Sequence, residues 1–145
     1  MILFAYDGSV HSDHAITVAG TLLGGGRARV VHAWDALADA SAIALPGFMP
    51  DDDGEARARE VAEAGAALAR LEGFEAEAEV VRCYGNPARA LEEAARRLTP
   101  DLVVLGNRGL RGLQAVMRKS SVSRRLGAHI LAPVLIIPSA HLARR

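Results

Sequence analysis

The sequence predicts an α/β domain in which helices cover both faces of an open parallel sheet. Five short apolar runs alternate along the chain with four stretches of helical periodicity. Strands that are apolar throughout are buried on both faces, which is typical of parallel sheets. Right-handed crossovers between them give the doubly wound arrangement. The 145 residues suit one domain with one core, so we expect residues 1–145 to form a single unit.

The first half of the chain predicts two buried strands separated by a helix. The run ILFAY (2–6) ends at the turn residues 7–9, and ARVVHAW (28–34) is the second strand. Between them, the three glycines 24–26 end a helix. The apolar face of that helix is predicted at Ala15, Val18, Ala19 and Leu22.

The middle of the chain predicts a long loop, a helix and a strand. From residue 35 to 54 no period holds, and a loop of that length in a compact domain is usually functional or mobile. Residues 55–72 are rich in Ala, Glu, Arg and Leu, and Gly73 follows as a stop signal. The apolar side of this helix is predicted at Val61, Gly65, Leu68 and Leu71. Residues 74–83 alternate and then become apolar, as a strand with one exposed flank does.

The last third predicts two more strand and helix pairs. Asn86 is a good N-cap and Pro87 suits the first helical position, so a helix should run from there to Thr99. LVVLG (102–106) and PVLII (133–137) are predicted strands, with a short helix over about 121–129 between them.

Charge is balanced overall but uneven along the chain. Seventeen basic and seventeen acidic side chains give no global field toward nucleic acid or a membrane surface. No apolar run approaches the roughly 18 residues of a membrane span, and no signal-peptide pattern follows Met1, so we expect a cytoplasmic protein. Residues 102–145, however, hold eight basic side chains and no acidic one. This part of the chain should prefer anions.

Several chemistries lack their sequence patterns. Cys83 is the single cysteine, so no internal disulfide can form, and we interpret it as inert core filler. The five histidines show no paired metal-ligand spacing. Neither a G-x-S-x-G nucleophile elbow nor a P-loop pattern occurs. Trp34 is expected to lie half-buried at a strand end, with stacking on a ligand ring as the alternative.

A ligand site is expected at the carboxyl ends of the strands, near the point where strand order reverses. Three loops meet that condition, at residues 7–9, 33–35 and 106–109. Gly106 and Gly109 would allow the backbone to approach an anion, and a helix beginning near Ser121 would direct its N–H groups there. The alternative is that the glycines only turn the chain and Ser121 only caps a helix.

Asp7 also has two interpretations. At the end of the first strand it could be a phosphoacceptor, a metal ligand, or an acceptor for a ligand's hydroxyl or amino group. A phosphoacceptor needs a cluster of carboxylates, and Asp13, the nearest, lies beyond the loop. Structurally, Asp7 would instead close an Asx turn into the first helix.

Four segments together resemble the universal stress protein family. The similarity runs from the first strand to the last, except over about residues 36–74. It lies in ILFAYDGSVHSDHAI, VVHAWD, GNPARALEEAARRLTPDLVVLGNRGLRG and SSVSRRLGAHILAPVLIIP.

The resemblance implies a Rossmann-like sheet of order 3-2-1-4-5. It also implies a homodimer through antiparallel pairing of the last strand, 133–137. Pro133 and Pro138 flank that strand and would limit how far the paired edge extends. Many members bind ATP, while others bind no nucleotide, so ATP, together with Mg²⁺, is the cofactor expected for this chain. Members are stress-response or regulatory proteins and not robust enzymes, so at most a weak ATPase is expected. The alternative function is a dimeric interaction module without nucleotide.

The family's phosphate motif is only partly present. It consists of Gly, two residues, Gly, nine residues, and Gly followed by Ser or Thr. Gly106 and Gly109 match, but the third glycine is replaced by Ser120 or Lys119, depending on the alignment. If that glycine has positive φ, the replacement costs about 1–2 kcal/mol. The nucleotide-binding positions implied by the resemblance are Tyr6, Asp7, Ala33, Gly106, Arg108, Gly109, Ser120, Ser121, Val122 and Ser123.

Overall fold

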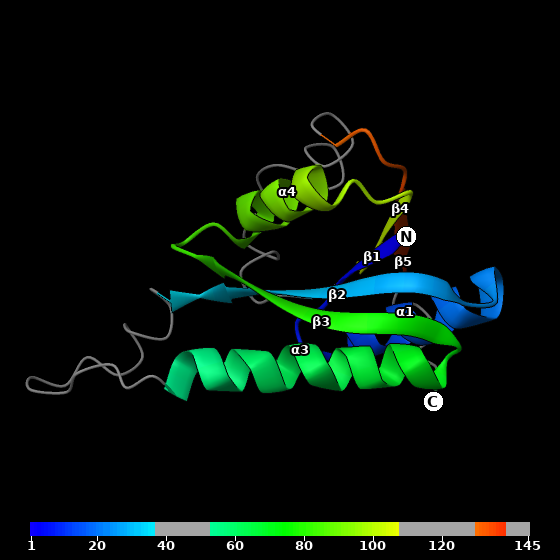
Figure 1. The fold of residues 1–145 in the computed structure, drawn as a ribbon, viewed down its shortest axis with the longest axis horizontal. Coiled ribbons are helices and arrows are strands. Elements are labelled where there is room, and N and C mark those ends of the chain that lie inside the picture. The colour runs from blue at the N-terminus through cyan, green and yellow to red at the C-terminus, as the bar shows by residue number, and fades with distance from the viewer. Residues whose placement is uncertain (37–52, 108–129, 139–145) are drawn as a thin grey trace, which may run out of the picture.

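A computed structural model of the chain describes residues 1–36, 53–107 and 130–138 (Figure 1). The described strands form one five-stranded sheet of order β3-β2-β1-β4-β5, and each neighbouring pair is parallel. The predicted fold class and strand order are therefore confirmed. The elements are β1 (Ile2–Ala5), α1 (Val10–Leu23), β2 (Gly26–Asp35), α3 (Asp53–Leu71), β3 (Phe74–Cys83), α4 (Pro87–Leu98), β4 (Leu102–Gly106) and β5 (Val134–Ile137).

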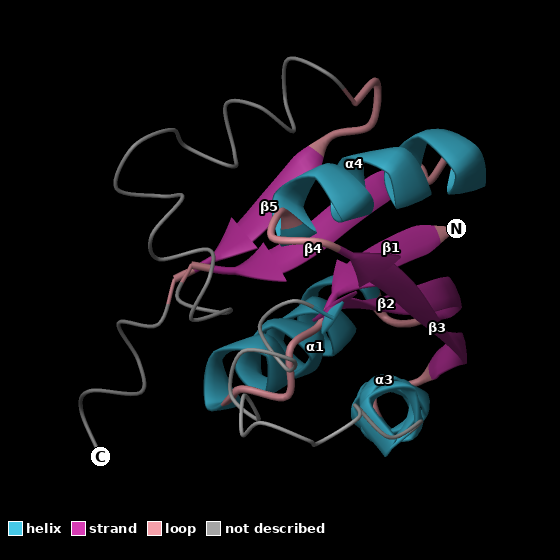
Figure 2. Ribbon diagram, turned by 90° about the vertical axis from the view of Figure 1, so that its left-hand side faces the viewer, coloured by secondary structure: helices cyan, strands magenta, loops and turns pink. Residues whose placement is uncertain are grey.

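Helices lie on both faces of the sheet. α1 and α3 cover one face and α4 covers the other (Figure 2). Successive strand residues point to opposite faces, so Phe4 packs with α1 and α3 while Leu3 packs with α4. On the first face the rings of Phe4 and Phe74 meet edge to face, with centroids 5.1 Å apart. The predicted helix over 121–129 and most of the predicted loop 35–54 lie outside the described residues.

The predicted ends of α4 are confirmed in detail. The Asn86 side chain accepts a hydrogen bond from the backbone N–H of Arg89 at 3.1 Å, and Pro87 occupies the first turn. At the other end Thr99 adopts a left-handed conformation, and its N–H donates to the carbonyl of Ala95 at 2.9 Å. These caps place β4 directly after the helix.

Two predicted core positions were wrong. Leu22 and Leu71 are 64% and 85% exposed, respectively. In α1 the buried face includes Ile16, which the predicted apolar face omitted. In α3 the predicted Val61 and Leu68 pack partly buried against the core, and the fully buried side chains are alanines spaced three or four apart. They are Ala58, Ala62, Ala66 and Ala69. Since alanines hold the helix close to the strands, the longer leucine side chain at the end of α3 is left outside the core.

Candidate functional site

The predicted site residues that the structure describes lie where β1, β2 and β4 end, and these parallel neighbours end on the same side of the sheet. The structure describes Tyr6, Asp7, Ala33 and Gly106 of the predicted residues. Those of the phosphate segment lie outside the described residues, namely Arg108, Gly109, Ser120, Ser121, Val122 and Ser123. Their roles stay predictions.

The turn after β1 is held by its own side chains. One carboxylate oxygen of Asp7, Oδ1, accepts hydrogen bonds from the Ser9 backbone N–H at 3.1 Å and from the Ser9 hydroxyl at 2.6 Å. The Ser12 hydroxyl in turn donates to the Ser9 carbonyl at 2.9 Å. This is the Asx turn that the structural interpretation of Asp7 predicted. The turn therefore orients the Asp7 carboxylate, and contact with a ligand stays a prediction for it.

Tyr6 is anchored inside the fold. Its hydroxyl donates to Oδ1 of Asp13 at 2.6 Å, and its carbonyl lies 2.9 Å from Nδ1 of His32. Burial, and then the hydrogen bond and negative charge of Asp13, raise the pKa of the Tyr6 hydroxyl, which stays protonated as a donor. A Cβ on Gly65 would lie 2.6 Å from the Tyr6 ring, so α3 packs directly on it.

Sequence reasoning missed these supporting residues. It placed Asp13 beyond the loop, whereas the first turn of α1 brings its carboxylate to Tyr6. Helical periodicity could have placed Asp13 on α1, but no local pattern links Gly65 or His32 to Tyr6, because those contacts join distant parts of the chain.

The side chain of Ala33 is buried in the core on the α4 face, so its backbone N–H and C=O are the groups that a ligand could contact. The carbonyl of Val31 accepts a hydrogen bond from the N–H of Tyr6 at 2.9 Å, so it points toward β1. Alternate residues of a strand direct their backbone groups to the same side, so the N–H and C=O of Ala33 point that way too. The paired part of β1 ends at Ala5, opposite Val31. A donor and an acceptor therefore lie side by side beyond the end of β1.

Gly106 is required by packing within the fold. A Cβ there would lie 2.7 Å from the carbonyl oxygen of His11 and 3.0 Å from its carbonyl carbon, in the first turn of α1. Gly106 is not among the residues with positive φ. The N–H of Asn107 then donates to the carbonyl of Ile137 at 3.0 Å, which extends the pairing of β4 with β5. The glycine at this position thus allows α1 to approach β4.

Trp34 is half-buried at the end of β2, as predicted. The guanidinium carbon of Arg82 lies 5.0 Å from the centre of the Trp34 ring and 5.5 Å from that of Tyr84. This cation–π arrangement gives Trp34 a partner within the fold, which favours the structural interpretation over ligand stacking.

The remaining reactive groups give little support to other chemistries. Cys83 is buried, and burial followed by the nearby charge of Asp35 raises the pKa of its thiol, which supports its interpretation as inert filler. Within residues 1–36, 53–107 and 130–138, no three His, Cys, Asp or Glu side chains converge on a point where a metal ion could bind. In the same ranges, no helix is both long enough and apolar enough to cross a membrane.

Comparison with known proteins gives consistent relatives over nearly the whole chain. A universal stress protein of Thermus aquaticus, encoded in the 3′ region of a QAH/OAS sulfhydrylase, is 33% identical over 138 residues, covering 94% of this chain and 96% of its own. A universal stress protein in complex with cAMP has a TM-score of 0.64 at 22% identity, covering 94% of both chains. A universal stress protein from Archaeoglobus fulgidus in complex with dAMP has a TM-score of 0.63 at 23% identity, covering 94% of this chain and 95% of its own.

The match to a family model decides the classification. The model of the universal stress protein family matches residues 1–138, which include all five strands of the sheet. With the relative from Thermus aquaticus, this match shows that the chain belongs to the universal stress protein family.

Proposed function

We propose that this protein is a regulatory binder of ATP or a related adenine nucleotide. The feature that carries the proposal is the backbone N–H and C=O of Ala33, which by strand alternation point toward the β1 side of β2, beside the Asp7 turn. A neighbouring donor and acceptor can hydrogen-bond to the edge of a planar base. The solved relatives bound to cAMP and dAMP support adenine as that base.

Each part of the nucleotide has a proposed partner. The Ala33 backbone would bind the base, and the Asp7 carboxylate would accept a hydrogen bond from a ribose hydroxyl or an amino group. Phosphate binding is assigned from the sequence to Gly109 and the serine segment 120–123, with Arg108 adding positive charge. Mg²⁺ would arrive with the phosphates, since the described residues offer it no cluster of ligands. Gly106, just before this segment, packs against the first turn of α1.

We propose binding without efficient turnover. Among the described residues at the strand ends, the candidate general base is Asp7, and its Oδ1 already accepts two hydrogen bonds from Ser9. The missing third glycine also weakens the phosphate motif. Replacing Lys119 or Ser120 by glycine would restore it, and the substitution that strengthens ATP binding would identify which alignment is correct.

We further propose that the protein is a homodimer through strand 133–137. β5 lies at an edge of the sheet, and three of its apolar side chains, Val134, Leu135 and Ile136, are only partly buried. Antiparallel pairing with a second β5 would cover them and satisfy the open backbone groups. This dimer belongs equally to the alternative function, an interaction module that needs no nucleotide.

Isothermal titration calorimetry with Mg-ATP and with AMP tests the binding proposal. We expect saturable binding, weakened about tenfold by Asp7→Asn, because asparagine can keep the turn through its amide oxygen but loses the negative charge. Glu60→Gln, an exposed change of equal charge on α3, is the matched control and should bind as the parent does. Absence of heat and of any thermal shift at millimolar nucleotide would favour the interaction module.

A further inference from the structure

The pairing of β1 with β2 stops one step before Ala33. The last paired residues are Ala5 and Val31, and just beyond them the N–H of Tyr6 donates to the carbonyl of Val31 at 2.9 Å. In a parallel ladder the next bond would run from the N–H of Ala33 to the carbonyl of Tyr6, because a strand bonds to one neighbour through every second residue. The structure places another donor at that carbonyl.

This donor is the side chain of His32. Nδ1 of its imidazole lies 2.9 Å from the carbonyl oxygen of Tyr6. A carbonyl oxygen only accepts, so Nδ1 carries the proton, and a neutral His32 is held as the Nδ1–H tautomer. The imidazole therefore competes with the N–H of Ala33 for the acceptor that the next bond of the ladder would use.

The acceptor itself is held firmly, because Tyr6 is fixed at both its backbone and its side chain. Its hydroxyl donates to Oδ1 of Asp13 at 2.6 Å, and its N–H is bonded to β2. A Cβ on Gly65 would lie 2.6 Å from the Tyr6 ring, so α3 leaves the ring no room to shift. The carbonyl that His32 meets thus has a set position.

His32 also lies between the two proposed ligand contacts. It directly precedes Ala33 in β2, and its acceptor Tyr6 directly precedes Asp7. By strand alternation the backbone of His32 points toward β3, whereas that of Ala33 points toward the β1 side. The bond from the imidazole to the Tyr6 carbonyl therefore joins the two segments at the place where a nucleotide base is proposed to bind.

We propose that His32 is a positioning residue of the nucleotide site, which keeps the N–H of Ala33 available to the base by donating to the Tyr6 carbonyl in its place. This inference rests on the proposed binding of an adenine nucleotide. His32 does not itself touch the nucleotide. Without the imidazole donor, the N–H of Ala33 bonds to the Tyr6 carbonyl, because a backbone acceptor inside the fold recruits another donor. The strand ladder then lengthens by one step, and the base loses its donor.

Two substitutions of His32 test the effect on binding by calorimetric titration with AMP. His32→Phe keeps a ring of similar size but has no donor, whereas His32→Asn places an amide N–H near the position of Nδ1. We expect His32→Phe to bind AMP about tenfold more weakly and His32→Asn to stay within about threefold of the parent. Thermal unfolding checks that each variant is folded.

The affinity separates positioning from a purely structural role. If His32 only satisfied a buried carbonyl, His32→Phe would lower the thermal midpoint and leave the affinity of the folded protein unchanged. That outcome would overturn the proposal. It would be overturned equally by a loss of affinity in His32→Asn as large as that in His32→Phe, because the missing donor would then not be the cause.

Nuclear magnetic resonance of the ligand-free full chain, labelled with ¹⁵N and ¹³C, tests the same inference without a nucleotide. In the parent at pH 8, the imidazole nitrogen shifts should identify His32 as the Nδ1–H tautomer. A scalar coupling across a hydrogen bond from the Ala33 N–H to the Tyr6 carbonyl should be absent in the parent and present in His32→Phe. The Nε2–H tautomer, or this coupling already in the parent, would refute the inference even if His32→Phe did not fold.

The two measurements also separate this inference from the proposed function. If the parent binds neither AMP nor Mg-ATP while the tautomer and the coupling are as expected, the proposed function fails and the control of the strand ladder by His32 stands. If the parent binds AMP but the coupling is already present, the proposed function stands and His32 is not the residue that frees Ala33.

Discussion

The two edges of the sheet leave different surfaces open. β3 is ten residues long and carries glutamates at alternate positions on one side. β5 is four residues long, its first three side chains are apolar and partly buried, and prolines 133 and 138 flank it. Length and charge thus vary together, because a long open edge needs charged side chains to discourage pairing with the wrong strand, whereas a short one does not.

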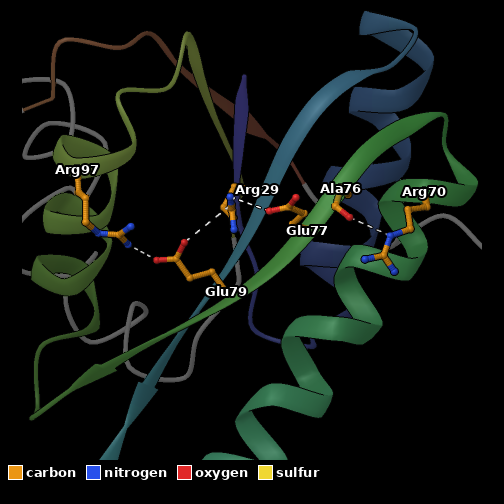
Figure 3. Close-up of polar contacts among 6 residues, drawn as sticks. All are labelled: Arg29, Arg70, Ala76, Glu77, Glu79 and Arg97. Carbon is orange, nitrogen blue, oxygen red and sulfur yellow. Dashed lines mark hydrogen bonds and ion pairs between the residues drawn. The ribbon is translucent and has the colours of Figure 1, made fainter.

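The edges also differ in how they are supported. Arg29 of β2 lies 2.8 Å from Glu77 and 3.9 Å from Glu79, and Arg97 of α4 also pairs with Glu79 (Figure 3). β5 is held by β4, where the N–H of Val103 donates to the carbonyl of Pro133 at 2.9 Å. We therefore expect the β3 edge to tolerate solvent and the β5 edge to need apolar cover.

The largest effect should come from removing the apolar anchor of each edge. Phe74→Ala at the start of β3 should lower the free energy of unfolding by about 3–5 kcal/mol, since it leaves a cavity beside Phe4. Ile137→Ala at the end of β5 should cost about 2 kcal/mol, because fewer buried atoms are lost. Urea unfolding measures both. A larger loss at Ile137 would reverse the proposed difference in how the edges are anchored.

The second-largest effect should come from placing a lysine on each edge and comparing how much it weakens the dimer. Leu135→Lys on β5 should weaken the proposed dimer at least about a hundredfold, because it would bury an ammonium group in an apolar contact. Sedimentation velocity would then show a monomer. Glu77→Lys is the matched change on β3 and should leave the mass unchanged. If Leu135→Lys also leaves the mass unchanged, the two-fold contact does not lie at β5.

A smaller effect should distinguish two glutamates of the β3 edge. Glu79, with 18% of its side chain exposed, pairs with two arginines, so Glu79→Gln should lower stability by about 1 kcal/mol. Glu77, at 71% exposure, should lose less than about 0.5 kcal/mol as Glu77→Gln. Thermal unfolding of the two variants makes the comparison. Equal losses would mean that the ion pairs of Glu79 with Arg29 and Arg97 add nothing to stability, despite the low exposure of Glu79.

The smallest effect should arise at the amino ends of β1 and β4, between the two edges. The hydrogen bond from the Met1 ammonium group, and then its charge, lower the pKa of the Asp101 carboxyl in the folded protein. A lowered pKa stabilises the fold above the ordinary carboxyl pKa, and this stabilisation is lost as pH falls through the folded value. Asp101→Asn should therefore be slightly less stable than the parent at pH 7, and the gap should close in acid. A gap that stays constant with pH would exclude this ion pair as the cause.

Local patterns account for what could be predicted from the sequence. The apolar runs and the Asn86-Pro87 cap depend on neighbouring residues, and they match the structure closely. The Asx turn at Asp7 was one of two local alternatives. The ion network around Glu79 and the exposure of Leu71 depend on residues brought together by the fold, so no spacing along the chain signals them. For the same reason, the location of the candidate site at the strand ends was predictable. The side-chain contacts that support those strand ends were not.

The contact between Gly106 and His11 changes how sequences of this kind should be interpreted. A glycine at this position is needed to seat the first helix against the fourth strand whether or not the protein meets a nucleotide. A homologue that has lost its ligand would have to keep it. The presence of Gly106 is therefore evidence for the fold and not by itself for a bound nucleotide.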